Sequence, residues 1–186
     1  MAAMLLAYVA VTPSRKSQTP IPIQVPQSIP STTTPEAYHY GLPKRLQIPK
    51  IGIDAEVQYM GVTAEGDMES PKGPAEVGWY KHGPRPGEKG SSVIAGHFGW
   101  LNQPSVFDNL HKLTKGDSLY VLDDQGMSVA FVVRESRSYS PDDNTADIFT
   151  QNDGGGHLNL ITCEGAWDEA RQAYTKRLVV FADKAN

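Results

Sequence analysis

The chain contains a single cysteine among its 186 residues, Cys163, and this scarcity limits the protein's chemistry. One thiol cannot close a disulfide within the chain, so packing must stabilise the fold. With one cysteine and scattered histidines, zinc and haem sites are not expected either. Positive charge is also not in excess, because 17 Lys and Arg residues stand against 21 Asp and Glu residues, for a formal net charge of -4. Nucleic-acid binding through bulk charge is therefore not expected.

The N-terminal part lacks a hydrophobic run long enough to cross a bilayer. Its apolar stretch Met4–Val11 falls short of the roughly 20 residues that a transmembrane helix needs, but it could be the stump of a membrane anchor. Six of the 14 prolines lie between Thr12 and Glu36 amid Ser, Thr and Gln, which predicts an extended spacer without a core. We therefore expect an anchor stump (1–11), a Pro-rich spacer (12–37) and a folded domain (38–186), with an ordinary disordered tail as the alternative for the first two.

Short apolar runs separated by Gly, Pro and Asp predict a mostly β domain. The expected strands are Leu46–Ile48, Ile53–Val57, Glu76–Tyr80, Ser92–Gly96, Ser118–Leu122, Met127–Tyr139, Leu158–Cys163 and Arg177–Ala182. Apolar residues in Pro104–Leu113 recur every three and four positions, which indicates a short amphipathic helix, and another helical turn is expected around Asp143–Phe149. Many short strands with one or two brief helices favour a barrel or a sandwich.

Three residues with complementary chemistry stand at predicted strand ends. Cys163 ends one strand and Arg177 begins the next, so antiparallel pairing would bring them together. His97 follows the run Val93–Gly96, and a rigid strand end can aim a side chain at a cleft. A thiol needs a base or a cation nearby to become a useful nucleophile. The trio predicts an acyl-transfer site in which the cysteine attacks, the histidine moves protons and the arginine holds the oxyanion.

Other residues compete for these roles. His157 precedes the cysteine strand, but at about 3.3 Å per residue it would lie roughly 20 Å from Cys163. Arg171 and Lys176 compete with Arg177 for the role of the cation, and the segment Glu164–Lys176 is expected to be a loop that caps the site.

Other classes of protein compete as well. A cysteine at a strand end is often only a small buried hydrophobe, so a non-enzymatic surface β-domain that binds peptides is the alternative. A papain-like hydrolase would place its cysteine before its histidine, the reverse of this chain. An L,D-transpeptidase would show a Ser-His-Gly-Cys-like run, which Thr162–Gly165 does not supply.

Four separated segments resemble the sortases, the membrane-anchored cysteine transpeptidases of bacterial surfaces. They are Val93–His97, Phe107–Asp117, Leu160–Cys163 and Lys176–Val180. The resemblance spans about residues 42–183 and implies an eight-stranded sortase-type β-barrel with one or two short helices. It also implies that His97, Cys163 and Arg177 are the catalytic residues. The segment Trp79–Glu88 is similar to the loop before the histidine in sortases of classes D, E and F, and class F or E is favoured.

The resemblance further implies a reaction and a location. A sortase, a peptidase of the thiol-protease type, cleaves an LPXTG-like sorting signal between Thr and Gly, holds the acyl group as a thioester and passes it to an amine. The amine would come from a cell-wall precursor or a pilin lysine, at the extracellular face of the bacterial membrane. Thr162 takes the family position that lines the substrate groove. No cofactor is expected, although calcium could be held by acidic loop residues, namely Glu65, Asp67, Glu69, Asp142 and Asp143.

Overall fold

The computed structural model describes residues 39–100 and 103–185. The predictions for residues 1–37, the anchor stump and the Pro-rich spacer, lie outside the described residues. Within the described part, none of the helices combines the length and the apolar character that a membrane span requires.

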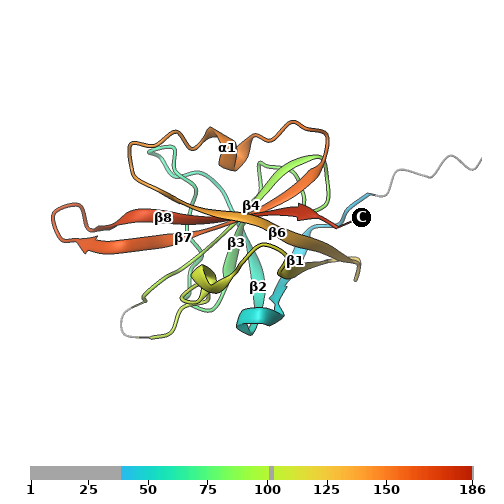
Figure 1. Ribbon diagram of the computed structural model, residues 1–186, viewed down its shortest axis with the longest axis horizontal. Coiled ribbons are helices and arrows are strands. Elements are labelled where there is room, and N and C mark those ends of the chain that lie inside the picture. Colours follow the sequence, from blue (N-terminus) through green and yellow to red (C-terminus); the bar gives the residue numbers. More distant parts are fainter. Residues whose placement is uncertain (1–38, 101–102, 186) are drawn as a thin grey trace, which may run out of the picture. The chain divides into compact units, whose positions relative to one another are not determined.

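The described residues form a closed barrel of eight strands (Figure 1). The strands are Pro43–Ile48 (β1), Ile53–Met60 (β2), Val77–Tyr80 (β3), Gly90–Gly96 (β4), Ser118–Asp123 (β5), Ser128–Tyr139 (β6), Gly156–Asp168 (β7) and Ala173–Lys184 (β8). Around the barrel their order is β1-β2-β3-β4-β7-β8-β6-β5. Two neighbouring pairs are parallel, β2 with β3 and β4 with β7, and the other pairs are antiparallel. Each predicted strand is confirmed, and the mostly β barrel expected from the sequence is the observed fold.

The hairpin of β7 and β8 is longer than predicted. These two strands continue past Cys163 and Arg177 as a two-stranded extension, seen as the orange and red arrows that project from the barrel in Figure 1. The register shifts between Glu164 and Trp167, after which Trp167 pairs with Tyr174. The prediction of a capping loop over Glu164–Lys176 is therefore wrong, because this bulge lets the ladder resume and only a short turn remains.

The segment Pro104–Leu113 also differs from its predicted form, an amphipathic helix. The structure has turns followed by a 3-10 helix, η2, over Leu110–Lys112. Backbone bonds join residues three apart, with Leu110 N donating to Phe107 O at 3.0 Å and Leu113 N to Leu110 O at 3.1 Å. These three apolar residues are buried, and their spacing of three matches the period of a 3-10 helix, in which they share one face.

Two further helical segments are short. The residues between the first two predicted strands form a 3-10 helix, η1, over Pro49–Ile51, which was not predicted. The helical turn expected around Asp143–Phe149 is α1, Ala146–Phe149.

Alternate residues of the strands pack on two faces of the barrel wall. On β8, Leu178 and Val180 belong to the cluster that fills the barrel interior. Val179 and Phe181 instead pack with Ile148 of α1 in a second cluster. Because side chains along a strand point to opposite faces in turn, the odd-numbered residues of β8 face outward beneath α1. This outer face carries the candidate site.

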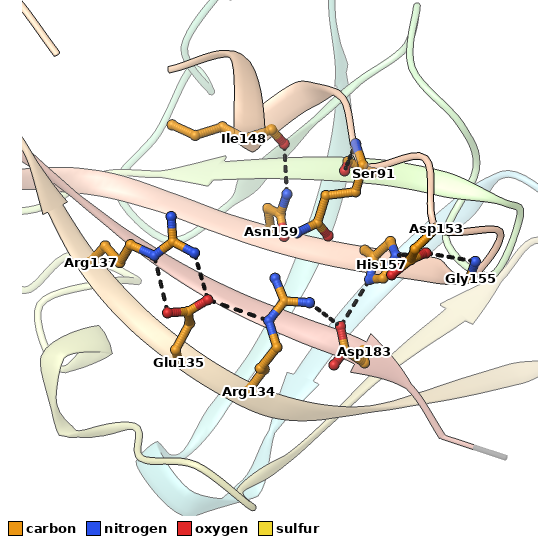
Figure 2. A network of polar contacts seen from close by, with 11 residues as sticks. Ser91, Arg134, Glu135, Arg137, Ile148, Asp153, Gly155, His157, Asn159 and Asp183 are labelled. Carbon is orange, nitrogen blue, oxygen red and sulfur yellow. Dashed lines mark hydrogen bonds and ion pairs between the residues drawn. The ribbon is translucent and has the colours of Figure 1, made fainter. Parts of the chain in front are cut away.

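A buried amide fastens α1 over that face. Asn159 of β7 is fully buried, and its side-chain nitrogen donates to the carbonyl of Ile148 at 2.6 Å (Figure 2). A buried polar group of this kind is costly unless it is bonded. The bond therefore holds the short helix, which has one turn and would not be stable alone, against the sheet.

A charged network joins the start of β7 to the end of β8, far from Cys163 along β7 (Figure 2). His157, which is 3% exposed, lies between two carboxylates, with Nδ1 2.8 Å from Asp183 and Nε2 2.8 Å from Asp153. Arg134 of β6 donates to the same Asp183 at 2.7 Å. The network links three neighbouring strands at this end of the barrel.

Candidate active site

The three predicted catalytic residues lie at adjacent strand positions. Strands β4, β7 and β8 are consecutive neighbours in the barrel, and His97 directly follows β4. Cys163 of β7 and Arg177 of β8 are Cα partners, and such partners lie roughly 4.5 to 5.5 Å apart. The parallel pairing of β4 with β7 aligns Ala95 with Ile161 at its last pair. The Thr162 hydroxyl bonds to Gly96 O at 2.8 Å, so we infer that the next residues on each segment, His97 and Cys163, are also neighbours. The structure thus brings the three together, with the cysteine in the middle.

Their side chains share the outer face of the barrel wall. Ile161 and Val179 pack against the cluster beneath α1. Cys163 follows Ile161 by two positions and Arg177 precedes Val179 by two, so both side chains point to the same face as these apolar residues.

Thr162 has a defined place in this arrangement. Its side chain is 4% exposed, and its hydroxyl donates to the carbonyl of Gly96 at 2.8 Å. Gly96 directly precedes His97, and Thr162 directly precedes Cys163. The bond therefore ties the end of β4, which presents the imidazole, to the part of β7 that presents the thiol. Its predicted role in substrate binding stays a prediction.

The thiol of Cys163 is half-buried, and two effects act on it. Burial raises the pKa of Cys163, and the positive charge of Arg177 lowers this pKa, with burial the larger effect. Because burial is the larger effect, the net shift is upward, which favours the thiol over the thiolate. The thiolate, which is the nucleophile, must then be generated by a base during the reaction. His97, on the neighbouring strand end, is placed for that role.

The guanidinium of Arg177 is held along its own strand. Its Nη1 atom donates to the carbonyls of Tyr174 and Lys176 at 3.1 and 3.0 Å. A guanidinium carries five N–H donors in a planar fork, so an oxyanion can be bound by others of them. The two carbonyls fix the charge beside Cys163, where negative charge would develop during acyl transfer.

Two contacts hold the imidazole of His97, one with a backbone carbonyl and one with an aromatic ring. Nε2 lies 2.8 Å from the backbone carbonyl oxygen of Pro71. The ring of Trp100 lies against it, with ring centroids 4.4 Å apart and planes inclined by 59°. The main chain of His97 is fixed as well, because its carbonyl accepts from Phe107 N at 3.1 Å.

Aromatic residues beside the site were missed by the sequence analysis. Phe98 meets Tyr174 edge-on at a centroid distance of 5.4 Å, and Tyr174 meets Trp167 at 5.3 Å. They connect the segment after His97 to the hairpin beyond Cys163. The available signal was the placement of Trp167 and Tyr174 two residues before and two residues after the turn 169–172, which is typical of cross-strand partners.

The rival residues lie elsewhere. His157 pairs with Asp183 near the start of β7, six positions from Cys163 along the strand. Arg171 is exposed in the turn of the hairpin, 3.8 Å from Asp168. Lys176 is exposed and adjoins Arg177 in sequence, so it points to the other face of the strand. The assignment of the two roles to His97 and Arg177 stays a prediction.

No group of three or more His, Cys, Asp and Glu residues within 39–100 and 103–185 is arranged to hold a metal ion. Calcium binding by the acidic loop residues stays a prediction.

The fold and the site together describe a closed β-barrel with a thiol, an imidazole and a guanidinium at neighbouring strand positions. The family model of the sortase domain matches residues 46–185. The match covers most of the sequence, and the chain belongs to the sortase family. Sortases are cysteine transpeptidases that act at the cell surface, and this defines the class of activity.

Solved structures of sortases resemble this barrel. Sortase C-1 from Actinomyces oris is 25% identical, with a TM-score of 0.61, over 76% of this chain and 73% of that one. Sortase C1 from Streptococcus agalactiae is 25% identical, with a TM-score of 0.61, over 77% and 67%. A lid mutant of sortase A from Corynebacterium diphtheriae, at 21% identity over 82% and 74% with a TM-score of 0.61, shares the fold. None of the curated proteins matches the chain significantly. The class, expected to be F or E, stays a prediction.

Proposed function

We propose that this sortase cleaves an LPXTG-like sorting signal between Thr and Gly through a thioester on Cys163 and transfers the acyl group to an amine. The observation that carries the proposal is the strand register, which sets Cys163 between His97 and Arg177 on one face of the wall. A nucleophile, a proton carrier and a cation on rigid neighbouring strands are the groups that acyl transfer requires.

In the first half-reaction, His97 removes the thiol proton and the sulfur attacks the threonine carbonyl. The new C–S bond places negative charge on the carbonyl oxygen, which Arg177 stabilises beside Cys163. The resulting imidazolium gives its proton to the amine of the departing glycine as the C–N bond breaks. A thioester and a neutral imidazole remain.

In the second half-reaction, an amine takes the place of the glycine. His97 accepts the proton that the amine loses as it attacks the thioester, and the thiolate leaves. The proton then returns to Cys163, which restores the resting thiol. Water in place of the amine would give hydrolysis, the reaction of a thiol peptidase. All steps use side chains of the chain itself, so we propose no cofactor.

For Thr162 we propose a contribution to substrate binding through position. Its hydroxyl already donates to Gly96 O, so it acts by keeping the end of β4 in register with β7 at Cys163. We propose that the acyl acceptor is an amine of a cell-wall precursor or a pilin lysine. The protein would attach other proteins to the surface at the extracellular face of the bacterial membrane, with residues 1–11 as part of its anchor.

Incubation with an LPXTG-type peptide and an excess of a small amine tests the proposal. We expect a product in which the amine replaces the glycine-containing fragment, detected by liquid chromatography and mass spectrometry. Cys163→Ala should give none of it, whereas substitution of the exposed residue His111 should leave its yield unchanged. A non-enzymatic peptide-binding domain would return the peptide intact, and product formation by Cys163→Ala would also contradict the proposal.

A further inference from the structure

We propose that His97 exchanges the reacting proton through Nδ1, while Nε2 permanently donates a hydrogen bond to the backbone carbonyl of Pro71. The inference rests on the proposed function, in which His97 carries protons to and from Cys163 and the substrate amines. It assigns a positioning role to Pro71, a residue outside the predicted trio.

The assignment follows from the chemistry of the contact. Nε2 of His97 lies 2.8 Å from Pro71 O, an ordinary hydrogen-bond length. A carbonyl oxygen only accepts, so the ring nitrogen that contacts it must carry the hydrogen. In a neutral imidazole one nitrogen donates and the other accepts. With hydrogen on Nε2, the lone pair that can accept a proton is on Nδ1.

The surroundings keep the ring in this orientation. Pro71 is buried, and the segment that contains it is tied to the chain after β4 because Pro74 O accepts from Val106 N at 2.7 Å. The ring of Trp100 lies beside the imidazole, with ring centroids 4.4 Å apart and planes inclined by 59°. The bond to Phe107 N fixes the carbonyl of His97 itself. A ring held by a hydrogen bond, a neighbouring ring and its backbone has little freedom to exchange its two nitrogens.

The contact also has a function in each proton transfer. When Nδ1 takes the thiol proton, the ring becomes positively charged and its Nε2–H bond to Pro71 O becomes a stronger, charge-assisted bond. Pro71 O thus serves as the orienting group that a carboxylate provides in a Ser-His-Asp triad. A neutral carbonyl stabilises the imidazolium less than a carboxylate would. This agrees with a resting state in which the thiol of Cys163 keeps its proton.

Replacement of His97 by Nδ1-methylhistidine in the full chain tests the assignment. The methyl group blocks the proposed reacting nitrogen and leaves the size of the ring nearly unchanged. We expect acyl-enzyme formation with an LPXTG-type peptide to slow by about 100-fold or more, the contribution typical of general acid–base catalysis. The same analogue at the exposed His111 is the matched control and should leave the rate unchanged. A rate within about threefold of the unmodified enzyme would overturn the proposal.

Nitrogen-15 NMR of histidine-labelled, unmodified protein gives an independent readout. At a pH where His97 is neutral, we expect hydrogen on Nε2 and a lone pair on Nδ1. A ring with hydrogen on Nδ1 would overturn the proposal, whether or not the methylated variant folds. A merely structural role for Pro71 would not fix the tautomer. If the unmodified enzyme forms no acyl-enzyme, the proposed function fails instead, and the NMR result still decides which nitrogen carries hydrogen.

Discussion

Replacement of Thr162 by valine removes one hydroxyl and keeps the shape of the side chain. The hydroxyl donates to Gly96 O at 2.8 Å, and the residue is 4% exposed, so water cannot replace the lost donor. Loss of one hydrogen bond costs about 1 kcal/mol, and a buried acceptor left facing a methyl group raises the total to about 2 kcal/mol. For a chain of this size, that corresponds to a melting temperature lower by about 4 to 8 °C.

The same substitution should slow catalysis. The bond joins the residue before His97 to the residue before Cys163, so its loss loosens the alignment of imidazole and thiol. Misplacement of reacting groups by about 1 Å can cost 100-fold in rate, and we expect a fall in kcat of at least tenfold.

Differential scanning calorimetry and peptide-transfer kinetics on three proteins measure both effects. Thr162→Ser keeps the hydroxyl and is the matched control, and it should retain most of the activity. If Thr162→Val melts and turns over like the wild type, the hydrogen bond does not hold the site in register and the reasoning is refuted.

Three more predictions follow from other parts of the barrel. Arg177→Gln removes the positive charge that lowers the pKa of Cys163. The rate of alkylation of Cys163 by iodoacetamide should therefore rise at a higher pH than in the wild type. A rise at the same pH as in the wild type, or at a lower one, would contradict this. Hydrogen bonds from the backbone N–H of Gly155 and, second, from the His157 ring lower the pKa of Asp153 in the folded protein below its ordinary value of 3.8. The ionised carboxylate of Asp153 therefore contributes its whole stabilisation above pH 3.8. This contribution is lost as the pH falls through the lowered pKa of the folded state. Asp153→Asn should therefore lower the melting temperature at neutral pH and converge with the wild type in strong acid; a constant difference at all pH values would argue against it. Asn159→Ala removes the hydrogen-bond donor to α1 and should lower the free energy of unfolding by about 1 to 3 kcal/mol. The backbone amides of residues 146–149 should then exchange hydrogen faster. Unchanged exchange would count against the prediction.

Much of the fold was accessible from local sequence patterns. Period-two alternation and turn residues locate each strand, because these signals depend on a few neighbouring residues. The ends of the apolar runs in the sequence point to Cys163, Arg177 and His97 for the same reason, although β7 and β8 continue past the first two. Their adjacency followed partly from the sequence, since a hairpin brings the first two together.

The rest depends on contacts between distant segments. The parallel pairing of β4 with β7, which brings His97 to the cysteine, joins residues 66 positions apart, such as Ala95 and Ile161, and leaves no local signal. The bulge that extends the β7–β8 hairpin also depends on a cross-strand pair, Trp167 with Tyr174. Apolar spacings of three and four residues are compatible with both an α-helix and a 3-10 helix. The sequence pattern therefore does not show that Leu110–Lys112 forms a 3-10 helix, which packing selects. The contact of Pro71 with His97 is likewise tertiary.

Mapping of the acylated residue tests the central claim most directly. The enzyme is mixed with an LPXTG-type peptide without added amine, quenched in acid and digested, and the modified fragment is sequenced by mass spectrometry. The account predicts the mass of the threonine-ended acyl group on Cys163, released by hydroxylamine. Cleaved peptide with an unmodified Cys163, or an acyl group on another residue, would contradict it.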